Sequence, residues 1–338
     1  MDSTTEITTS EAGALVELGQ GFWAAKTFLT AVELDLFTVL AEKPLTEPEV
    51  RERLGLHPRA TRDFLDALVG LGVLLREDGR YRGSAAAEMY LDKHKPTYIG
   101  GRLLLLNWRY EVWGRLPDLL RSGDPQSKSR HDFDAFYRNP EAVKRFMLAM
   151  DGANAEIGPA LARAFDWTGK GSFVDIGGAR GNLAAEIVKA HPHLTGGCLD
   201  LPPVEPVFDE HMARLGLADR VTFHPADFFT DPLPETDVMV FGHVLHDWDD
   251  ENRVRLLRRA YEALPEGGVA LVYDALVDDD RRDPANLLRS LSMRLVTPGG
   301  SEYTAADCRG WLEAAGFTDV STTPLTRSDA LVVAHKQA

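Results

Sequence analysis

Cysteine is nearly absent from this chain, with only Cys198 and Cys308 among 338 residues. Two cysteines cannot form a disulfide framework or a cysteine-only metal site. Long apolar runs are also missing, since none reaches the roughly 18 residues that a membrane-spanning helix needs. Residues 1–10 are polar and lack the apolar core of a signal peptide. These absences predict a cytoplasmic protein with no membrane partner.

Basic charge is scarce as well. Lys and Arg number 37 against 52 Asp and Glu, which gives a formal net charge of −15. This balance disfavours nucleic acid and anionic membrane surfaces as partners, because both repel an acidic protein. The length and the 44% hydrophobic content predict two domains with substantial cores.

The most informative stretch is a glycine-rich turn between a predicted strand and a predicted helix. The apolar segment 172–176 contains Asp175 and leads into the turn 177–181, which begins at Gly177. Such a turn lets a nucleotide-like ligand approach the backbone at a helix N-terminus. The glycine spacing is not the G-x-G-x-x-G fingerprint of dinucleotide sites. An acid two residues before the first glycine favours a ligand with a cationic group; a tight turn without a ligand is the alternative.

Two further acids stand at the ends of the next predicted strands. Asp200 follows the strand 194–199, at the position that binds ribose hydroxyls in such folds. Asp227 follows the strand 221–224. Three acids at the carboxyl ends of three successive strands predict a site for an adenosine ligand with a positive centre. This combination points to S-adenosyl-L-methionine as the cofactor.

Residues 1–100 contain no cofactor pattern and predict several helices followed by a hairpin that turns at Asp78-Gly79. This is a winged-helix outline, which often binds DNA. The candidate recognition helix at 59–71 carries two aspartates beside its two arginines, so burial against another subunit is the favoured interpretation. The apolar face of the first helix, with Leu15, Leu18 and Phe22, has no evident partner inside so small a domain.

The remaining chain divides into two parts. Residues 101–166 are helical and rich in large side chains, and Phe146 and Met150 share one helix face. They are candidates for an aromatic pocket over the cofactor, with an ordinary helical core as the alternative. From 167 to 338, strands alternate with helices, which predicts a mostly parallel sheet of the α/β class.

A histidine lies in the loop after the fourth predicted strand, 237–241. Loops at this edge of a parallel sheet face the ligand crevice, and the loop contains His246. A histidine near a methyl donor can act as a general base at neutral pH. Asp274 ends the fifth predicted strand, and Glu302 follows the turn 297–300. Either acid could accept the other ring N–H of the histidine and orient its ring.

At this point the sequence resembles a known family. Its residues Leu245-His246-Asp247-Trp248 and Pro298-Gly299-Gly300-Ser301-Glu302 are similar to those of S-adenosylmethionine-dependent methyltransferases of the caffeic acid and hydroxyindole O-methyltransferase type. Actinomycete relatives from aromatic antibiotic pathways belong to the same type. The resemblance covers nearly the whole chain. It implies a Rossmann-like class I methyltransferase sheet, a winged-helix-like α-helical dimerisation domain at residues 1–100, a helical connector at 101–166 and a catalytic domain at 167–338.

The resemblance also implies roles for individual residues. His246 matches the family's catalytic base, and Asp274 and Glu302 match its supporting acids. The expected acceptor is a hydroxyl of a small aromatic molecule, the expected product of the cofactor is S-adenosyl-L-homocysteine, and the expected assembly is a homodimer. Expected cofactor contacts are Asp175, Gly177, Asp200, Leu201, Asp227, Phe228 and Gly242. Expected acceptor contacts are Phe146, Met150, Asp247 and Met293.

Three positions depart from the family pattern. Ala179 replaces a common glycine, and its methyl group should be tolerated. Asp274 replaces a glutamate of the plant members, so its support of His246 could be shorter or mediated by water. Gly242 replaces a lysine that touches the cofactor in plant members, so that contact should be missing.

Several alternatives stay open. Similar folds transfer methyl groups to carbon or nitrogen, and one relative performs hydroxylation. His243, His246 and Asp247 could bind a metal ion, but no third histidine stands at a suitable later position, so no metal is predicted. The identity of the acceptor is not encoded in any pattern recognised in the sequence.

Overall fold

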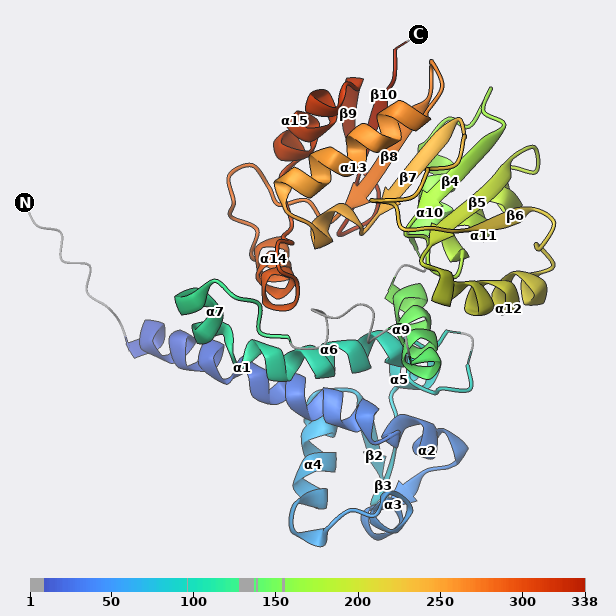
Figure 1. Cartoon of the computed structure of the whole chain (residues 1–338). Helices are drawn as coiled ribbons and strands as arrows, with labels where there is room; N and C mark the ends of the chain where they lie inside the picture. Colours follow the sequence, from blue (N-terminus) through green and yellow to red (C-terminus); the bar gives the residue numbers. More distant parts are fainter. Residues whose placement is uncertain (1–8, 96, 128–136, 138, 154–155, 338) are drawn as a thin grey trace, which may run out of the picture. The chain divides into compact units, whose positions relative to one another are not determined.

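The computed structural model describes residues 9–95, 97–127, 137, 139–153 and 156–337. The chain forms two compact units, Met1–Glu111 and Val112–Ala338, and each is described by itself (Figure 1). The division expected from the sequence, with boundaries after residues 100 and 166, stays a prediction. Among the helices of these described residues, none is long and apolar enough to cross a membrane.

The first unit is mainly helical and carries a small antiparallel sheet of strand order β1-β3-β2. Its elements are α1 (Thr9–Glu33), α2 (Leu36–Glu42), β1 (Leu45–Thr46), α3 (Glu47–Leu54), α4 (Pro58–Gly70), β2 (Leu74–Glu77), β3 (Arg80–Gly83), α5 (Ala85–Tyr90) and all but the last two residues of α6 (Gly100–Trp113).

Local sequence explains the hairpin and the start of α3. Thr46 and Glu49 form a reciprocal capping box at the N-terminus of α3. Asp78 and Gly79 have φ values of 49° and 75°, which is the pair of left-handed residues that a tight two-residue hairpin needs. The predicted hairpin is therefore present, and it packs on the apolar core of the helices.

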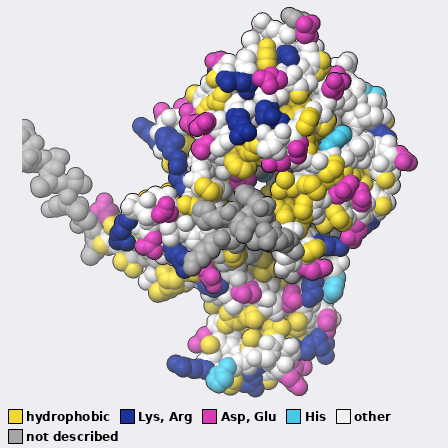
Figure 2. Space-filling model, in the orientation of Figure 1, with side chains coloured by type: hydrophobic (Ala, Val, Ile, Leu, Met, Phe, Trp, Pro, Cys, Tyr) yellow, Lys and Arg dark blue, Asp and Glu magenta, His cyan; other side chains and the backbone are white. Residues whose placement is uncertain are grey.

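Helix α1 exposes large apolar side chains within its own unit. Leu15 is 71% exposed, Leu18 is 79% exposed, and Phe22 and Trp23 are also exposed. Hydrophobic side chains reach the surface along this helix in Figure 2. Apolar side chains that stay this accessible are typical of a surface that another chain covers.

The second unit is built on a seven-stranded sheet of order β6-β5-β4-β7-β8-β10-β9. Strands β6, β5, β4, β7 and β8 run parallel, whereas β10 is antiparallel to both of its neighbours. The strands are β4 (Ser172–Ile176), β5 (Thr195–Asp200), β6 (Val221–Pro225), β7 (Val238–Gly242), β8 (Val269–Asp274), β9 (Thr318–Pro324) and β10 (Ala330–His335). The helices are α7 (Leu116–Ser122), α9 (Pro140–Ala153), α10 (Ile157–Ala164), α11 (Asn182–Ala190), η1 (Pro202–Val204), α12 (Glu205–Leu215), η2 (Leu245–Asp247), α13 (Asp250–Ala263), α14 (Pro284–Val296) and α15 (Ala305–Ala315).

Alternating side chains of the central strands fill two cores, one on each face of the sheet. One core packs α10, α11 and α12 around Phe173, and the other packs α13 and α15 around Phe241. From β4 the chain proceeds outward to β5 and β6, and it then returns to β7 on the other side of β4. In such sheets ligands bind at the carboxyl ends of the strands where the order reverses. The α/β fold predicted from the sequence is confirmed, and its strand order predicts a ligand site at the ends of β4 and β7.

Candidate active site

The glycine turn after β4 is tightly built. Gly177 has φ 73°, and a Cβ atom added to it would lie 2.9 Å from Val244 Cγ2. A Cβ at Gly181 (φ 77°) would lie 2.7 Å from the Phe208 ring. Ala179 itself adopts φ 50°, so its methyl group is accommodated at a cost of about 1–2 kcal/mol. The turn therefore places backbone without side chains at the carboxyl end of β4.

Two buried carboxylates flank this turn. Asp200 Oδ2 accepts the Ala179 N–H at 2.9 Å, and Oδ1 accepts the Leu201 N–H at 2.7 Å. Burial nevertheless raises the pKa of Asp200 to about 6. Burial, reinforced by the nearby charge of Asp200, also raises the pKa of Asp175. Within the described part of the chain, no basic side chain pairs with either acid, so a positively charged ligand would stabilise both.

The third acid and its neighbour lie at the end of β6. Asp227 Oδ1 accepts the Phe229 N–H at 2.8 Å and shapes this loop. The ring of Phe228 lies beside the glycine turn, because a Cβ at Gly177 would be 3.9 Å from Phe228 Cε1. Phe228 also packs edge-on against Trp248 of the histidine loop. An aromatic wall thus stands next to the turn, as a flat base would need.

His246 lies in η2 after β7, with two buried acids at the same ring nitrogen. Its Nδ1 is 3.2 Å from Glu302 Oε1 and 3.3 Å from Asp274 Oδ1, so Asp274 approaches the ring without a bridging water. Both carboxylates are fully buried, and the histidine side chain is 15% exposed. Burial alone would favour the neutral ring, but the charges of Glu302, Asp274 and Asp247 outweigh it and raise the pKa of His246 to about 9.

Arg253 and Tyr303 hold this group together, and sequence reasoning missed both. Arg253 is 2% exposed, and it donates to Leu245 O at 2.8 Å and to Ser301 O at 2.6 Å. It therefore ties the histidine loop to the segment that carries Glu302. The Tyr303 hydroxyl donates to Asp274 Oδ2 at 2.5 Å.

The sequence contains a signal for Arg253. The buried positions of α13 are Arg253, Leu256, Leu257 and Ala260. This is the i, i+3, i+4, i+7 spacing of a core-facing stripe, and an arginine in that stripe indicates a buried polar role.

Gly300 lets the motif 298–302 approach the histidine loop. A Cβ at Gly300 would lie 2.4 Å from His246 O, and the Gly300 N–H donates to Thr297 Oγ1 at 2.9 Å. A side chain at this position would push the loop away from His246. Gly300 thus allows the two loops of the site to pack closely together.

His243 forms a second acid–histidine pair beside the first. Its backbone has φ 52°, and its Nε2 is 2.9 Å from Asp329 Oδ1. The rings of His243 and His246 are stacked at 5.5 Å. Among the described residues, the group whose ligand atoms could hold a metal ion is His246, Asp274 and Glu302, within 4.8 Å of one another. This set differs from the trio considered in the sequence, and the expectation of no metal stays a prediction.

The candidate acceptor residues are only partly brought together. Phe146 packs in a cluster with Val204 and with Ala179 of the glycine turn. Helix α9, which carries Phe146, is held over that turn by an ion pair between Asp151 and Arg180. Met150 is half-buried on the same helix. Met293 is buried in α14, and Asp247 lies in η2. Their roles stay predictions.

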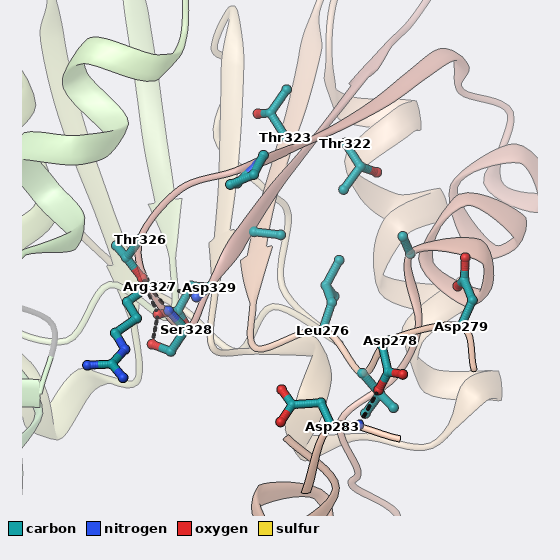
Figure 3. Close-up of a pocket in the computed structure, with 14 residues that line it drawn as sticks. Leu276, Asp278, Asp279, Asp283, Thr322, Thr323, Thr326, Arg327, Ser328 and Asp329 are labelled. Atoms are coloured by element: carbon teal, nitrogen blue, oxygen red, sulfur yellow. Dashed lines mark hydrogen bonds between the residues drawn. The ribbon is translucent and has the colours of Figure 1, made fainter. Parts of the chain in front are cut away.

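A separate pocket lies beside the loop after β8. It has a volume of about 370 Å³ and is lined by residues 276–279 and by the turn between β9 and β10. Figure 3 shows Thr326 and Ser328 hydrogen-bonded to Asp329 on one side, with Asp278 and Asp283 on the other. None of the predicted site residues lines it. Two of its lining residues adjoin the site, because Asp329 forms a hydrogen bond with His243 and Ala330 pairs with Asp274 across β10 and β8.

Comparison with known proteins identifies the family. A model of the O-methyltransferase domain matches residues 113–318, and a model of the O-methyltransferase dimerisation domain matches residues 16–93. The chain therefore belongs to the O-methyltransferase family. It is an S-adenosylmethionine-dependent methyltransferase, and the predicted family, fold and cofactor are confirmed.

Individual relatives agree with this assignment. The chain is 50% identical over 327 residues to the tetracenomycin polyketide synthesis 8-O-methyl transferase TcmO of Streptomyces glaucescens, with 96% of each chain covered. It is 41% identical to the N,N-dimethyltransferase OxyT of Streptomyces rimosus, with 94% of each covered. Human N-acetylserotonin methyltransferase in complex with SAM has a similar structure, with a TM-score of 0.89, 30% identity and full coverage of both chains.

Proposed function

We propose that this enzyme transfers a methyl group to a hydroxyl of a small aromatic acceptor and that His246 is the general base. The observation that carries this proposal is the pair of buried carboxylates at His246 Nδ1, which leaves Nε2 for the acceptor. The 8-O-methyl activity in the name of TcmO supports a hydroxyl acceptor. Cytoplasmic location and the absence of a nucleic-acid partner remain predictions.

The site residues fit the cofactor in both shape and charge. The turn at Gly177 leaves no room for a side chain, and Asp200 offers a carboxylate to ribose hydroxyls. Asp175 would accept a cationic group, because it is buried without a basic partner among the described side chains. When bound, S-adenosylmethionine supplies an electrophilic methyl group on a positively charged sulfur.

The residues around His246 supply the proton transfer. His246 Nε2 takes the proton of the acceptor hydroxyl, whose pKa near 10 makes a base useful at neutral pH. Nδ1–H donates to Glu302 Oε1, which fixes the ring, and the charges of Glu302 and Asp274 stabilise the imidazolium. Phe146 and α9 would hold the acceptor in line, and such positioning is itself a large part of catalysis.

Transfer to nitrogen is the second candidate, because OxyT is named as an N,N-dimethyltransferase. A neutral amine is already nucleophilic, so it would depend on positioning more than on His246. The two candidates therefore differ in how strongly the rate depends on this histidine.

The cofactor assignment predicts a loss of affinity in Asp200→Ala. Removing the carboxylate leaves two ribose hydroxyls poorly paired, which should weaken S-adenosylmethionine binding by about 1–3 kcal/mol. Because the pKa of Asp200 is raised to about 6, wild-type affinity should also fall as the pH drops through 6. Isothermal titration calorimetry between pH 5 and 8 measures both effects. Asp219→Ala, which removes an exposed carboxylate before β6, is the control; equal affinities in all three proteins would contradict the assignment.

We also propose a homodimer built on residues 1–100, supported by the matched dimerisation model. The double variant Leu15→Glu/Leu18→Glu would bury two unpaired charges in the interface and should weaken the dimer at least about 100-fold. Leu120→Glu is the control, because Leu120 is as exposed as Leu15, at 71%, but lies in the other unit. Sedimentation velocity measures the assembly. A wild-type protein that sediments as a single chain at micromolar concentration would refute the proposal.

A further inference from the structure

Tyr273 lies across Gly242 at the carboxyl end of β7. The two residues face each other in the parallel pairing of β7 with β8. A Cβ atom added to Gly242 would be 1.9 Å from Tyr273 Cζ and 2.0 Å from its hydroxyl oxygen. Because Gly242 has no side chain, the tyrosine ring occupies the space over this residue of β7.

The Tyr273 hydroxyl is placed in a strongly negative environment without a partner. The side chain is 4% exposed, and among the described residues no group forms a hydrogen bond with its oxygen. Burial, together with the charges of Asp175, Asp274 and Asp329, raises the pKa of Tyr273. The hydroxyl therefore stays neutral and presents its lone pairs as an acceptor.

Its neighbours define what this oxygen faces. Asp175 lies in β4, the strand that pairs with β7 on the side away from β8. The cationic amino end of the cofactor is expected there. On the other side, the His243 ring packs edge-on against Tyr273 at 5.3 Å and is itself stacked on His246, where the acceptor is expected. The reacting sulfur and its methyl group must lie between these two ends.

We propose that the Tyr273 oxygen accepts C–H hydrogen bonds from the methyl group on the positively charged sulfur, and that this contact makes the site prefer S-adenosylmethionine to S-adenosylhomocysteine. The inference rests on the proposed placement of the cofactor. The positive charge polarises the methyl C–H bonds, and hydrogen bonds to charged groups are about twice as strong as neutral ones. The product lacks both the methyl group and the charge, so it gains nothing from this oxygen.

Calorimetry with the two ligands tests the contact. In Tyr273→Phe the dissociation constant of S-adenosylmethionine should rise about 5- to 30-fold, whereas that of S-adenosylhomocysteine should change less than about 2-fold. Tyr261→Phe, which removes a hydroxyl from α13, is the control and should change neither. A purely structural role would weaken both ligands equally, and that result, or no change for either, would overturn the proposal. These measurements need no acceptor, so they remain valid if the methylated atom is not oxygen.

A second pair of variants tests the role of Gly242. Gly242→Ala should displace the tyrosine ring and weaken S-adenosylmethionine as Tyr273→Phe does. In a Tyr273→Val background the added methyl group has space, so the same glycine substitution should have little further effect. An equal loss in both backgrounds would show that Gly242 acts independently of Tyr273, against the proposal.

Discussion

Replacing His246 with alanine is expected to lower kcat by about 10²–10⁴-fold, while cofactor affinity stays near the wild-type value. The imidazole acts on the acceptor proton, whereas the cofactor is held by the turn at Gly177 and by Asp200. Steady-state kinetics with a phenolic acceptor and calorimetry with S-adenosylmethionine measure the two quantities. Asp274→Asn and Glu302→Gln should each cost less, because each acid only orients the ring or stabilises its charge.

The pH dependence separates a base from a structural histidine. The pKa of His246 is raised to about 9, so the neutral, basic ring becomes more abundant as the pH rises from 7 toward 9, and the rate should rise with it. Glu302→Gln removes a negative charge beside His246 and should lower its pKa, so the rise of the rate with pH should occur at lower pH. The deficit of His246→Ala should shrink at high pH, where a phenol ionises unaided. If His246→Ala keeps most activity at pH 7, the assignment of a hydroxyl acceptor is wrong, and the methylated atom is an amine nitrogen or a ring carbon.

Replacing Arg253 with methionine should destabilise the catalytic unit by about 3–5 kcal/mol, because two charge-assisted bonds to buried carbonyl groups are lost. The loops of His246 and Glu302 would also lose their common anchor. Misplacement of catalytic groups by about 1 Å can cost about 10²-fold in rate, so kcat should fall although Arg253 touches no reacting atom. Urea unfolding and kinetics measure the two effects.

Arg258→Met on the same helix is the matched control. Arg258 is exposed, and its hydrogen bond to Ala314 O is long, at 3.4 Å, so its removal should change stability by less than about 0.5 kcal/mol. If both variants unfold at the same urea concentration, the buried network does not stabilise the site.

The sequence alone predicts those features of the site that depend on short stretches of chain. The turn at Gly177 and the acid Asp200 lie in a strand–turn–helix pattern, and loop position indicated His246, so topology alone placed them at one edge of the sheet. Contacts between residues that are far apart in the sequence could not be predicted in this way. Tyr303 reaches Asp274 only because the segment before α15 runs beside the chain that follows β8, where Thr304 pairs with Val277.

The contact between Tyr273 and Gly242 shows the same limit. In the sequence, Gly242 is notable only because plant members of the family have a lysine at this position. Nothing there indicates that Tyr273, 31 positions later, fills the space over Gly242. Strand register decides this contact, and register is a property of the assembled sheet. The acceptor contacts stay predictions, because Met150 and Met293 lie on helices and helix packing determines which side chains can meet an acceptor.

The two carboxylates at His246 Nδ1 have a consequence for turnover. Under the proposed mechanism, the positive charge that leaves the sulfur reappears on the imidazole, so the buried charge of the site is unchanged by methyl transfer. The acids that favour this imidazolium also retain its proton, as the pKa of about 9 indicates. Before another catalytic cycle, His246 must therefore lose its proton to solvent. Buffer bases that can reach the ring would then determine the rate of turnover.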